Sequence, residues 1–485
     1  VPRPRNFGQD DPRSFFALQA NGSGARAERL GCKAVRVGRD WRYGEQGHGV
    51  YWFPDLSELR RNHQLIMFNM TAYPPRWALQ QAEEATFWEA PGWEERVQWW
   101  GGYVEHCARA LAADVETFEI QNEPDLTCMQ QVKLSFEAGV ERYLRILRAG
   151  AAAVRRGAPG ALVAGIDVSG GDYDRGLPYS QALMGAAGDL LDVYTGHPYA
   201  GVRYFGDGQS PLWPAPNQER RKCQDTLAMI REHGGKQRFW VGEKGWGLDV
   251  KADPLSSYSR DFAACLVQSM ALAHSVPGVE RYFWFLEEGC NEHGYEYGLF
   301  RQGMPLPAAL AYATLAYVLH HAAPVASPDL GPLVQAHCFA CADTGQGVTV
   351  LWSEQQRSSV TLARLPADAV LLDMMGRETA RGRAGKAFTL TVDRAPAYLT
   401  YPLKSAPRMA DAVSQATVAN EQPVMLEAAF AADLRHLGAR LRNVTREAQT
   451  ATLSGPSGPQ QVSLDAGESR LVLLPTSRPL DQTPG

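Results

Sequence analysis

The segment Phe118-Glu119-Ile120-Gln121-Asn122-Glu123-Pro124-Asp125 is the most informative stretch of this chain. The residues leading into it, from Val115 to Ile120, alternate in polarity as a β-strand does, and the alternation stops at Asn-Glu-Pro. Proline removes a backbone donor and disfavours helical backbone at the residue before it. Glu123 is therefore predicted to lie in extended backbone at the end of a strand, where a ligand can reach it.

A second apolar strand also ends on a glutamate. The run Arg238-Phe239-Trp240-Val241-Gly242-Glu243 is followed by Lys244-Gly245-Trp246, so that glycines flank the glutamate on both sides. The two glutamates lie 120 residues apart (243 − 123 = 120). Two strand-end carboxylates at this separation suggest a pair on one face of a repeating β/α scaffold.

Predicted strands and helices alternate from about residue 14 to residue 323. Most of the strands are continuous apolar runs, as expected for strands buried on both faces of a parallel sheet. Eight β/α units in order predict a (β/α)8 TIM barrel, whose active site lies at the carboxyl ends of the strands. Both glutamates fall there, after strands four and seven. The predicted strands are 15–19, 34–38, 65–69, 115–120, 162–166, 191–195, 239–242 and 281–286, and the clearest helices are 97–111, 138–156, 257–273 and 306–321.

The pattern changes after the barrel predicted for residues 1–323. Short alternating segments separated by turn residues predict a β-sandwich over residues 324–403. Residues 404–420 are polar and are interpreted as a linker. Further strand-like segments up to residue 485 predict a second, smaller β-sandwich of immunoglobulin-like type.

Composition and charge exclude several classes of protein. The 485 residues carry a net charge of −5, which favours neither nucleic acid nor an anionic membrane as a partner. No apolar run reaches the roughly 18 residues that a membrane span needs. The longest such run, residues 306–319, is interrupted by Pro307, precedes His320-His321, and is typical of an amphipathic helix. The oligomeric state stays open.

The cysteines and the start of the chain carry less information. Cys338 and Cys341 form a CxxC pair in a strand-like segment, where positions three apart point to opposite faces, and no second pair completes a zinc site. We therefore expect no metal and no cofactor. The chain begins at Val1 without a charged-then-apolar leader, which fits a mature exported product or a trimmed sequence. We expect a secreted or periplasmic protein, with a cytoplasmic one as the alternative.

Paired carboxyl groups suit the cleavage of a glycosidic bond. One carboxyl donates a proton to the leaving oxygen, and the other attacks the anomeric carbon or activates water. Strands four and seven face each other across an eight-stranded barrel, so their end residues can meet over its mouth. On this hypothesis Glu123 is the acid/base and Glu243 is the nucleophile. Glu287 or Glu288, on strand eight, is the alternative nucleophile.

Four segments together are similar to clan A of the glycoside hydrolases, which are retaining (β/α)8-barrel enzymes. They are FEIQNEPD at 118–125, HPY at 197–199, WVGEKGW at 240–246 and YFWF at 282–285. Residues 55–77, the helix before Val115 and the segment 394–399 are most similar to family 39 and its relatives. The resemblance covers about residues 14–403. It implies that Glu123 is the acid/base, that Glu243 is the nucleophile and that the substrate is a carbohydrate.

The resemblance also implies roles for other residues. Asn122 resembles the asparagine that binds the sugar 2-hydroxyl, and Arg36 the arginine that keeps the nucleophile ionised. His197 and Tyr199 resemble the pair that borders the nucleophile, and Trp284 resembles the tryptophan that forms a floor under the sugar ring. The loop aromatics Trp77 and Trp246 are further candidates for sugar contacts.

Three positions depart from the pattern of the clan. Gly242 stands where Thr or Ser is common, Lys244 stands where an aromatic residue is common, and Asp125 stands where Asn is common. Strand alternation predicts that Lys244 points away from Glu243. The leading hypothesis is a retaining glycosidase acting on β-linked sugars. The alternatives are a non-catalytic carbohydrate-binding barrel and a transglycosylase with the same glutamate pair.

Overall fold

The computed structural model describes residues 3–20, 23–79, 83–169, 173–199, 204–205, 217–289, 291–430, 436–455 and 458–475. The chain divides into two compact units, Val1–Pro324 and Val325–Gly485, and each is described by itself below. The division lies within one residue of the end predicted for the barrel.

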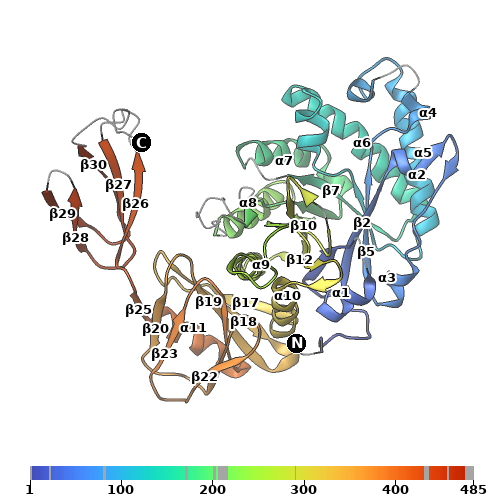
Figure 1. Cartoon of the computed structure of the whole chain (residues 1–485). Coiled ribbons are helices and arrows are strands. Elements are labelled where there is room, and N and C mark those ends of the chain that lie inside the picture. Colours follow the sequence, from blue (N-terminus) through green and yellow to red (C-terminus); the bar gives the residue numbers. More distant parts are fainter. Residues whose placement is uncertain are drawn as a thin grey trace. The chain divides into compact units, whose positions relative to one another are not determined.

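The first unit is a closed barrel of eight parallel strands, surrounded by helices (Figure 1). Around the barrel the strands follow the order β1-β12-β10-β8-β7-β6-β5-β2. The TIM barrel predicted from the sequence is therefore confirmed, with every predicted strand present. The eight strands are β1 (Phe16–Gln19), β2 (Ala34–Asp40), β5 (Leu65–Thr71), β6 (Thr117–Ile120), β7 (Leu162–Val168), β8 (Val193–Gly196), β10 (Arg238–Lys244) and β12 (Val279–Trp284).

Side chains inside the barrel form an apolar layer and a polar layer. The apolar layer contains Ala17, Ala34, Met67, Ala164, Val193, Trp240 and Phe283. Because side chains on a strand alternate in direction, the next inward residues lie two positions further toward the carboxyl ends. On β1, β2, β5 and β6 these residues are Gln19, Arg36, Asn69 and Glu119, all polar or charged. This polar layer lies directly beneath the mouth, by which we mean the end of the barrel at the carboxyl ends of the strands.

The helices that pack around the barrel begin at residues suited to that position. Ser135 and Ser256 accept hydrogen bonds from backbone N–H groups of the first turns of α6 and α9, as N-cap residues do. Pro307 opens α10, where its missing N–H costs nothing. The main helices are α1 (Gly24–Leu30), α5 (Trp93–Leu111), α6 (Phe136–Gly157), α7 (Tyr173–Ala187), α8 (Asn217–Glu232), α9 (Ser257–His274) and α10 (Pro307–Val318).

Helix α10 ends three residues earlier than predicted. Its last turn closes on Leu319, whose N–H bonds to Leu315, and His321 has a left-handed backbone with φ of 47°. His320 and His321 therefore lie beyond the end of the helix. No helix in the described part of the chain combines the length and the apolar character that a bilayer crossing requires.

The second unit begins with two antiparallel sheets around one apolar core. The sheet orders are β17-β18-β19-β24-β21-β22 and β23-β20-β25. Buried side chains from both sheets, such as Leu351 and Val360, belong to one cluster. Strand β22, which the sequence did not predict, is mostly exposed and polar. The strands are β17 (Ala322–Ala326), β18 (Val334–Cys341), β19 (Gln346–Ser353), β20 (Ser358–Leu362), β21 (Ala369–Leu372), β22 (Glu378–Gly382), β23 (Phe388–Val392), β24 (Ala397–Pro402) and β25 (Thr417–Asn420).

The interpretation of residues 404–420 as a linker is wrong. Helix α11 (Ala406–Ser414) buries Met409 and Val413 completely in the core of this unit. Strand β25 then pairs with β20. The apolar residues of α11 recur at helical spacing, and their burial holds the segment in place.

The remaining strands form a smaller group with a separate core. The sheets are β26-β27-β30 and β28-β29, and apolar side chains such as Leu441, Leu453 and Leu464 gather between them. The strands are β26 (Val424–Phe430), β27 (His436–Asn443), β28 (Gln449–Gly455), β29 (Gly458–Leu464) and β30 (Ser469–Pro475). Both β-sandwich assignments stay predictions, while the antiparallel sheets themselves are present.

Candidate active site

The structure brings the two predicted catalytic glutamates together at the mouth of the barrel. Glu123 follows β6, and Glu243 lies near the end of β10. One carboxylate oxygen of each and one ring nitrogen of His197 all lie within 4.8 Å of one another. The side chains of Glu123 and Glu243 are 19% and 12% exposed, so both remain accessible to a ligand.

The backbone at Glu123 differs from the prediction. It is not extended but left-handed, with φ of 43°, and Gln121 also has a positive φ of 73°. The carbonyl of Glu123 accepts hydrogen bonds from the N–H groups of Leu126 and Thr127, which closes a turn directly after the strand. Non-glycine residues seldom adopt this conformation, and it costs on the order of 1–3 kcal/mol for each residue. The surrounding hydrogen bonds therefore hold Glu123 in a strained position.

Arg36, on β2, is the centre of the site. Its side chain is 4% exposed, and its guanidinium contacts Glu243 at 2.9 Å. Arg36 and Glu243 are therefore direct neighbours. Because a guanidinium only donates, the oxygen of the Asn122 amide must be the atom that faces Arg36. The amide NH2 group of Asn122 therefore points away from Arg36. Its other partners are Glu119 at 2.7 Å, Asn122 at 2.6 Å, Asp167 at 2.8 Å and Gln19 at 3.0 Å.

His197 links the acid/base candidate to a buried aspartate. Its Nδ1 lies 2.9 Å from Glu123 Oε1, and its Nε2 lies 2.6 Å from Asp167 Oδ1. Burial by itself would lower the pKa of His197, but the negative charges of Asp167 and Glu243 outweigh it and hold the pKa well above its usual range. His197 is therefore an imidazolium that donates from Nδ1 to Glu123 and forms an ion pair with Asp167.

Asp167, which sequence reasoning missed, carries the opposite charge. It lies at the end of β7 with φ of 24°, after Ile166 with φ of 76°, where the pairing with β8 shifts register. Burial raises the pKa of Asp167, but the charges of His197 and Arg36 lower it more strongly, so the net shift is downward. Asp167 therefore holds both cations of the site. The only signal in the sequence was a lone aspartate at the end of an apolar run.

Asp167 also explains the glycine that precedes Glu243. A Cβ atom at Gly242 would lie 2.7 Å from Asp167 Oδ1 and 3.2 Å from Thr195 Cβ. A side chain at position 242 and this placement of Asp167 exclude each other. Position 242 therefore departs from the clan pattern because Asp167 occupies the space that a side chain there would need. Asp125, another departure, accepts hydrogen bonds from the N–H and hydroxyl of Ser169, at 2.9 and 2.6 Å.

Tyr199 and Lys244 lie close to Glu243 along the chain and in space, but only Tyr199 contacts its carboxylate. The Tyr199 hydroxyl donates to Glu243 Oε1 at 3.2 Å. Lys244 points away from Glu243, as strand alternation predicted, with its Nζ 4.5 Å from the Tyr199 ring and 3.8 Å from the Trp246 ring. Burial lowers the pKa of Lys244 to about 8, although the carboxylate of Glu219 opposes the shift.

The pKa of Glu243 corrects one expectation. Arg36 favours the charged carboxylate, as the resemblance implied, and so does His197. Burial nevertheless prevails, with help from the charges of Glu123 and Asp167, and raises the pKa of Glu243 to about 7. A nucleophile at this position is fully ionised only above neutral pH.

Trp284 does not form the floor of the site. Phe283 belongs to the barrel interior, so Trp284 points outward, and it is fully buried against Trp246 and Phe262. The same alternation turns Phe285, which is partly exposed, toward the mouth. Of these two aromatic residues at the end of the strand, only Phe285 is partly exposed.

The two loop tryptophans are packing residues. Trp246 is 1% exposed and leaves no face for a sugar. Trp77 is partly exposed, but its ring stacks on His48 at 4.5 Å and its indole N–H donates to the Glu45 carbonyl. No contact in the described part of the chain joins Trp77 to Glu123 or Glu243.

The alternative nucleophiles make other contacts. Glu287 is fully buried and accepts a hydrogen bond from the N–H of Ser23. Glu288 pairs with Arg26. Neither belongs to the group formed by Glu123, His197 and Glu243. Glu243 therefore remains the candidate nucleophile.

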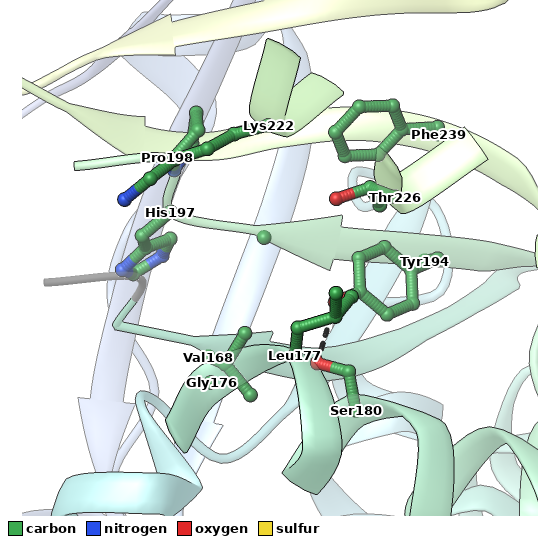
Figure 2. A pocket seen from close by; sticks show the side chains of 11 residues that line it. Val168, Gly176, Leu177, Ser180, Tyr194, His197, Pro198, Lys222, Thr226 and Phe239 are labelled. Atoms are coloured by element: carbon green, nitrogen blue, oxygen red, sulfur yellow. Dashed lines mark hydrogen bonds between the residues drawn. The ribbon is translucent and has the colours of Figure 1, made fainter. Parts of the chain in front are cut away.

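A small pocket lies behind His197, between α7, α8 and the barrel strands (Figure 2). Its volume of about 40 Å³ suits water and not a sugar ring. Ser180 and Tyr194 are hydrogen-bonded to each other on its wall. We assign it no role in binding the substrate.

No protein-family model matches the sequence, and no curated protein matches it. Solved structures do match. A family 39 glycoside hydrolase from the gut symbiont Bacteroides cellulosilyticus WH2 has a TM-score of 0.62 at 18% identity, over 80% of this chain and 80% of that one. A family 30 endoxylanase from Clostridium papyrosolvens C71 has a TM-score of 0.52 at 13% identity, over 82% of this chain and 98% of that one. A glucosidase from Croceicoccus marinus has a TM-score of 0.52 at 12% identity, over 82% of this chain and 97% of that one. The closed barrel and these neighbours confirm the resemblance at the level of architecture: the chain has the barrel fold of the clan A glycoside hydrolases.

Proposed function

We propose that this protein is a retaining glycoside hydrolase in which Glu243 is the nucleophile and Glu123 the acid/base. The observation that carries the proposal is the approach of the two carboxylates to within 4.8 Å. Retaining enzymes place their carboxyl groups about 5–5.5 Å apart, whereas inverting enzymes need about 6.5–9.5 Å to admit a water. The short separation favours attack by the carboxylate itself.

The first step forms a glycosyl-enzyme. Glu243 attacks the anomeric carbon, the glycosidic C–O bond breaks, and Glu123 gives its proton to the leaving oxygen. Arg36 and Tyr199 hold the two oxygens of Glu243. His197 donates to one oxygen of Glu123, which leaves the other oxygen to carry the transferred proton.

The second step releases the sugar. Glu123, now a carboxylate, removes a proton from water, the water oxygen bonds to the anomeric carbon, and the bond to Glu243 breaks. The anomeric configuration is inverted twice and therefore retained. Asn122, fixed through its oxygen by Arg36, presents its amide NH2 as a donor for a sugar hydroxyl.

The test is to incubate the chain with aryl β-glycosides and polysaccharides and to follow the first-formed anomer by NMR. Because two of the structural neighbours are an endoxylanase and a glucosidase, β-xylosides and β-glucosides begin the panel. We expect the β-anomer to appear first. Appearance of the α-anomer would contradict the mechanism, and sugar binding without cleavage would favour a binding protein.

The role of Glu123 has its own control. In Glu123→Ala, the rate of the first step should fall far less with dinitrophenyl glycosides than with natural glycosides, because a good leaving group hardly needs the proton. Azide should restore turnover by attacking the intermediate. Equal losses for both kinds of substrate, without rescue by azide, would show that Glu123 is not the acid/base.

A further inference from the structure

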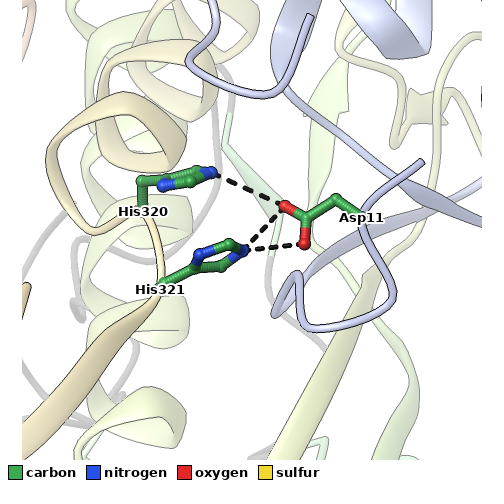
Figure 3. A group of neighbouring side chains, drawn as sticks. All are labelled: Asp11, His320 and His321. Carbon is green, nitrogen blue, oxygen red and sulfur yellow. Dashed lines mark hydrogen bonds and ion pairs between the residues drawn. The ribbon is translucent and has the colours of Figure 1, made fainter. Parts of the chain in front are cut away.

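A second group of ionisable side chains lies outside the site that contains Glu123 and Glu243. Asp11 precedes β1, and His320 and His321 follow α10 (Figure 3). The start of the first strand and the end of the last helix both lie at the amino-terminal end of a (β/α)8 barrel, opposite the mouth. This group is therefore separate from the site proposed for catalysis.

The three side chains converge on one point. His321 Nε2 lies 2.7 Å from Asp11 Oδ1, and His320 Nε2 lies 3.5 Å from Asp11 Oδ2. One ligand atom from each residue lies within 4.8 Å of the others. The rings of His320 and His321 lie face to face, with centroids 3.9 Å apart and a tilt of 32°. Both Nε2 atoms face the same carboxylate.

We propose that Asp11, His320 and His321 bind a divalent transition-metal ion of the zinc class. Two imidazole nitrogens and one carboxylate oxygen are a common ligand set for Zn²⁺, with water in the remaining position. The side chain of Asp11 is 6% exposed and those of His320 and His321 are each 12% exposed. The group is therefore mostly buried, but solvent can still reach it.

His320 supplies an independent observation. Both of its ring nitrogens are buried, and neither has a hydrogen-bond partner among the described residues. A buried polar atom left without a partner costs free energy. A metal ion at Nε2 would remove that cost there.

The surroundings favour the carboxylate as a ligand. Asn6, which is buried, donates from Nδ2 to Asp11 Oδ2 at 2.9 Å and so fixes the orientation of the carboxylate. Such contacts from residues around a metal ligand set its geometry.

Arg13 opposes binding in the metal-free protein. Its guanidinium donates to His321 Nδ1 at 2.9 Å. Because an arginine cannot accept, Nδ1 is the acceptor and Nε2 carries the proton that faces Asp11. A metal needs the lone pair of Nε2, so the ring proton must move to Nδ1 and the exposed Arg13 side chain must swing away. Removal of Arg13 should therefore strengthen binding.

The site would tie the first residues of the chain to the last helix of the barrel. Arg5 already links these segments, with its Nε donating to the Tyr317 carbonyl at 3.0 Å. A ligand that binds only the folded state stabilises it by mass action. We expect bound Zn²⁺ to raise Tm by about 4 °C at saturation.

The experiment uses the untagged full-length chain, stripped with EDTA and dialysed against Zn²⁺. We expect one Zn²⁺ per chain in addition to any bound by the glutamate pair, and its affinity should fall by more than about tenfold in Asp11→Asn and in His320→Ala. Glu243→Gln is the matched control, since it alters the other carboxylate–histidine group and should keep this site. Binding that is unchanged in Asp11→Asn and His320→Ala would overturn the proposal.

Arg13→Ala tests the proposal without removing a ligand. We expect tighter Zn²⁺ binding in Arg13→Ala, measured by competition with a chromophoric chelator. The absorption bands of bound Co²⁺, which report the ligand set, should be the same in this variant and the wild type. Affinity that is unchanged or weaker would show that His321 Nε2 is not a ligand. This measurement still decides the matter if the ligand variants fail to fold.

Discussion

At the residue scale, acids outnumber bases beneath the mouth of the barrel. Arg36 and His197 are the cations, and Glu119, Asp167, Glu123 and Glu243 are the carboxyl groups. Glycoside cleavage passes through a transition state with positive charge on the sugar. Carboxylates already fixed in place stabilise such a charge without reorganisation. The cations then keep those carboxylates in position.

The first prediction concerns Asp167. Replacing Asp167 by Asn keeps its shape but removes the negative charge beside His197, so the pKa of His197 should fall toward its usual range. His197 would then hold Glu123 less firmly, and we expect kcat/KM to drop by about 100-fold. NMR titration of the His197 ring, together with steady-state kinetics, measures both effects. An unchanged pKa of His197 would contradict the role given to Asp167.

The second prediction concerns pH. In the proposed mechanism Glu243 attacks only as a carboxylate, and its pKa is raised to about 7. Lowering the pH through 7 protonates Glu243, so kcat/KM should decline on the acidic side with an apparent pKa near this value. Tyr199→Phe removes a hydrogen bond to the charged form and should move this limb to higher pH. An acidic limb near pH 4 in both proteins would contradict the account.

Sequence reasoning found the residues that belong to motifs and missed those that do not. Glu123 and Glu243 each end a recognisable apolar strand, whereas Asp167 has no motif around it. The sequence pattern favours Trp284 over Phe285 wrongly, because alternation along a strand shows which residues share a face but not which face is the inner one. The structure places Phe283 in the barrel interior, and this fixes the directions of Trp284 and Phe285.

At the scale of elements, strands β7 and β10 are fitted to each other. Near its end β7 loses regular register with β8, and the turn of its backbone at Ile166 and Asp167 carries the aspartate toward Gly242 on β10. Contacts of this kind depend on tertiary structure. The sequence could predict both strands but not the way their ends fit together.

The third prediction tests this fit. Gly242→Ala adds a Cβ 2.7 Å from Asp167 Oδ1, so the carboxylate or the strand must shift. We expect a loss of about 1–3 kcal/mol in the free energy of unfolding, together with lower activity. Gly102→Ala is the control, because that exposed helical position has nothing within 4 Å of the new Cβ. Equal effects at both positions, measured by urea unfolding, would refute the explanation.

At the scale of the whole molecule, the apolar cores predict which parts can be removed. Residues 325–420 share one core that includes α11 and β25, and the strands after residue 423 have another. The sequence suggested a linker at 404–420 because charged and polar residues are spread along the whole segment. Met409 and Val413 nevertheless lie one helical turn apart on a buried face.

The fourth prediction compares two truncated chains. A chain that ends at residue 422 keeps Met409 and Val413 in their core and should retain the protease resistance of residues 325–420. A chain that ends at residue 403 loses α11 and β25, so buried residues such as Val360 become exposed and this region should be cleaved quickly. Limited proteolysis with mass spectrometry distinguishes the two. Equal resistance of both chains would restore the linker interpretation.

The central claim is that Glu243 forms a covalent bond to the sugar. A 2-deoxy-2-fluoro β-glycoside with a good leaving group slows the second step and traps that intermediate. After incubation with the glycoside from the panel that the protein cleaves, digestion and mass spectrometry should find the added fluorosugar on the peptide that contains Glu243, and no label should form in Glu243→Gln. A label on any other residue, or a label that persists in Glu243→Gln, would contradict the account.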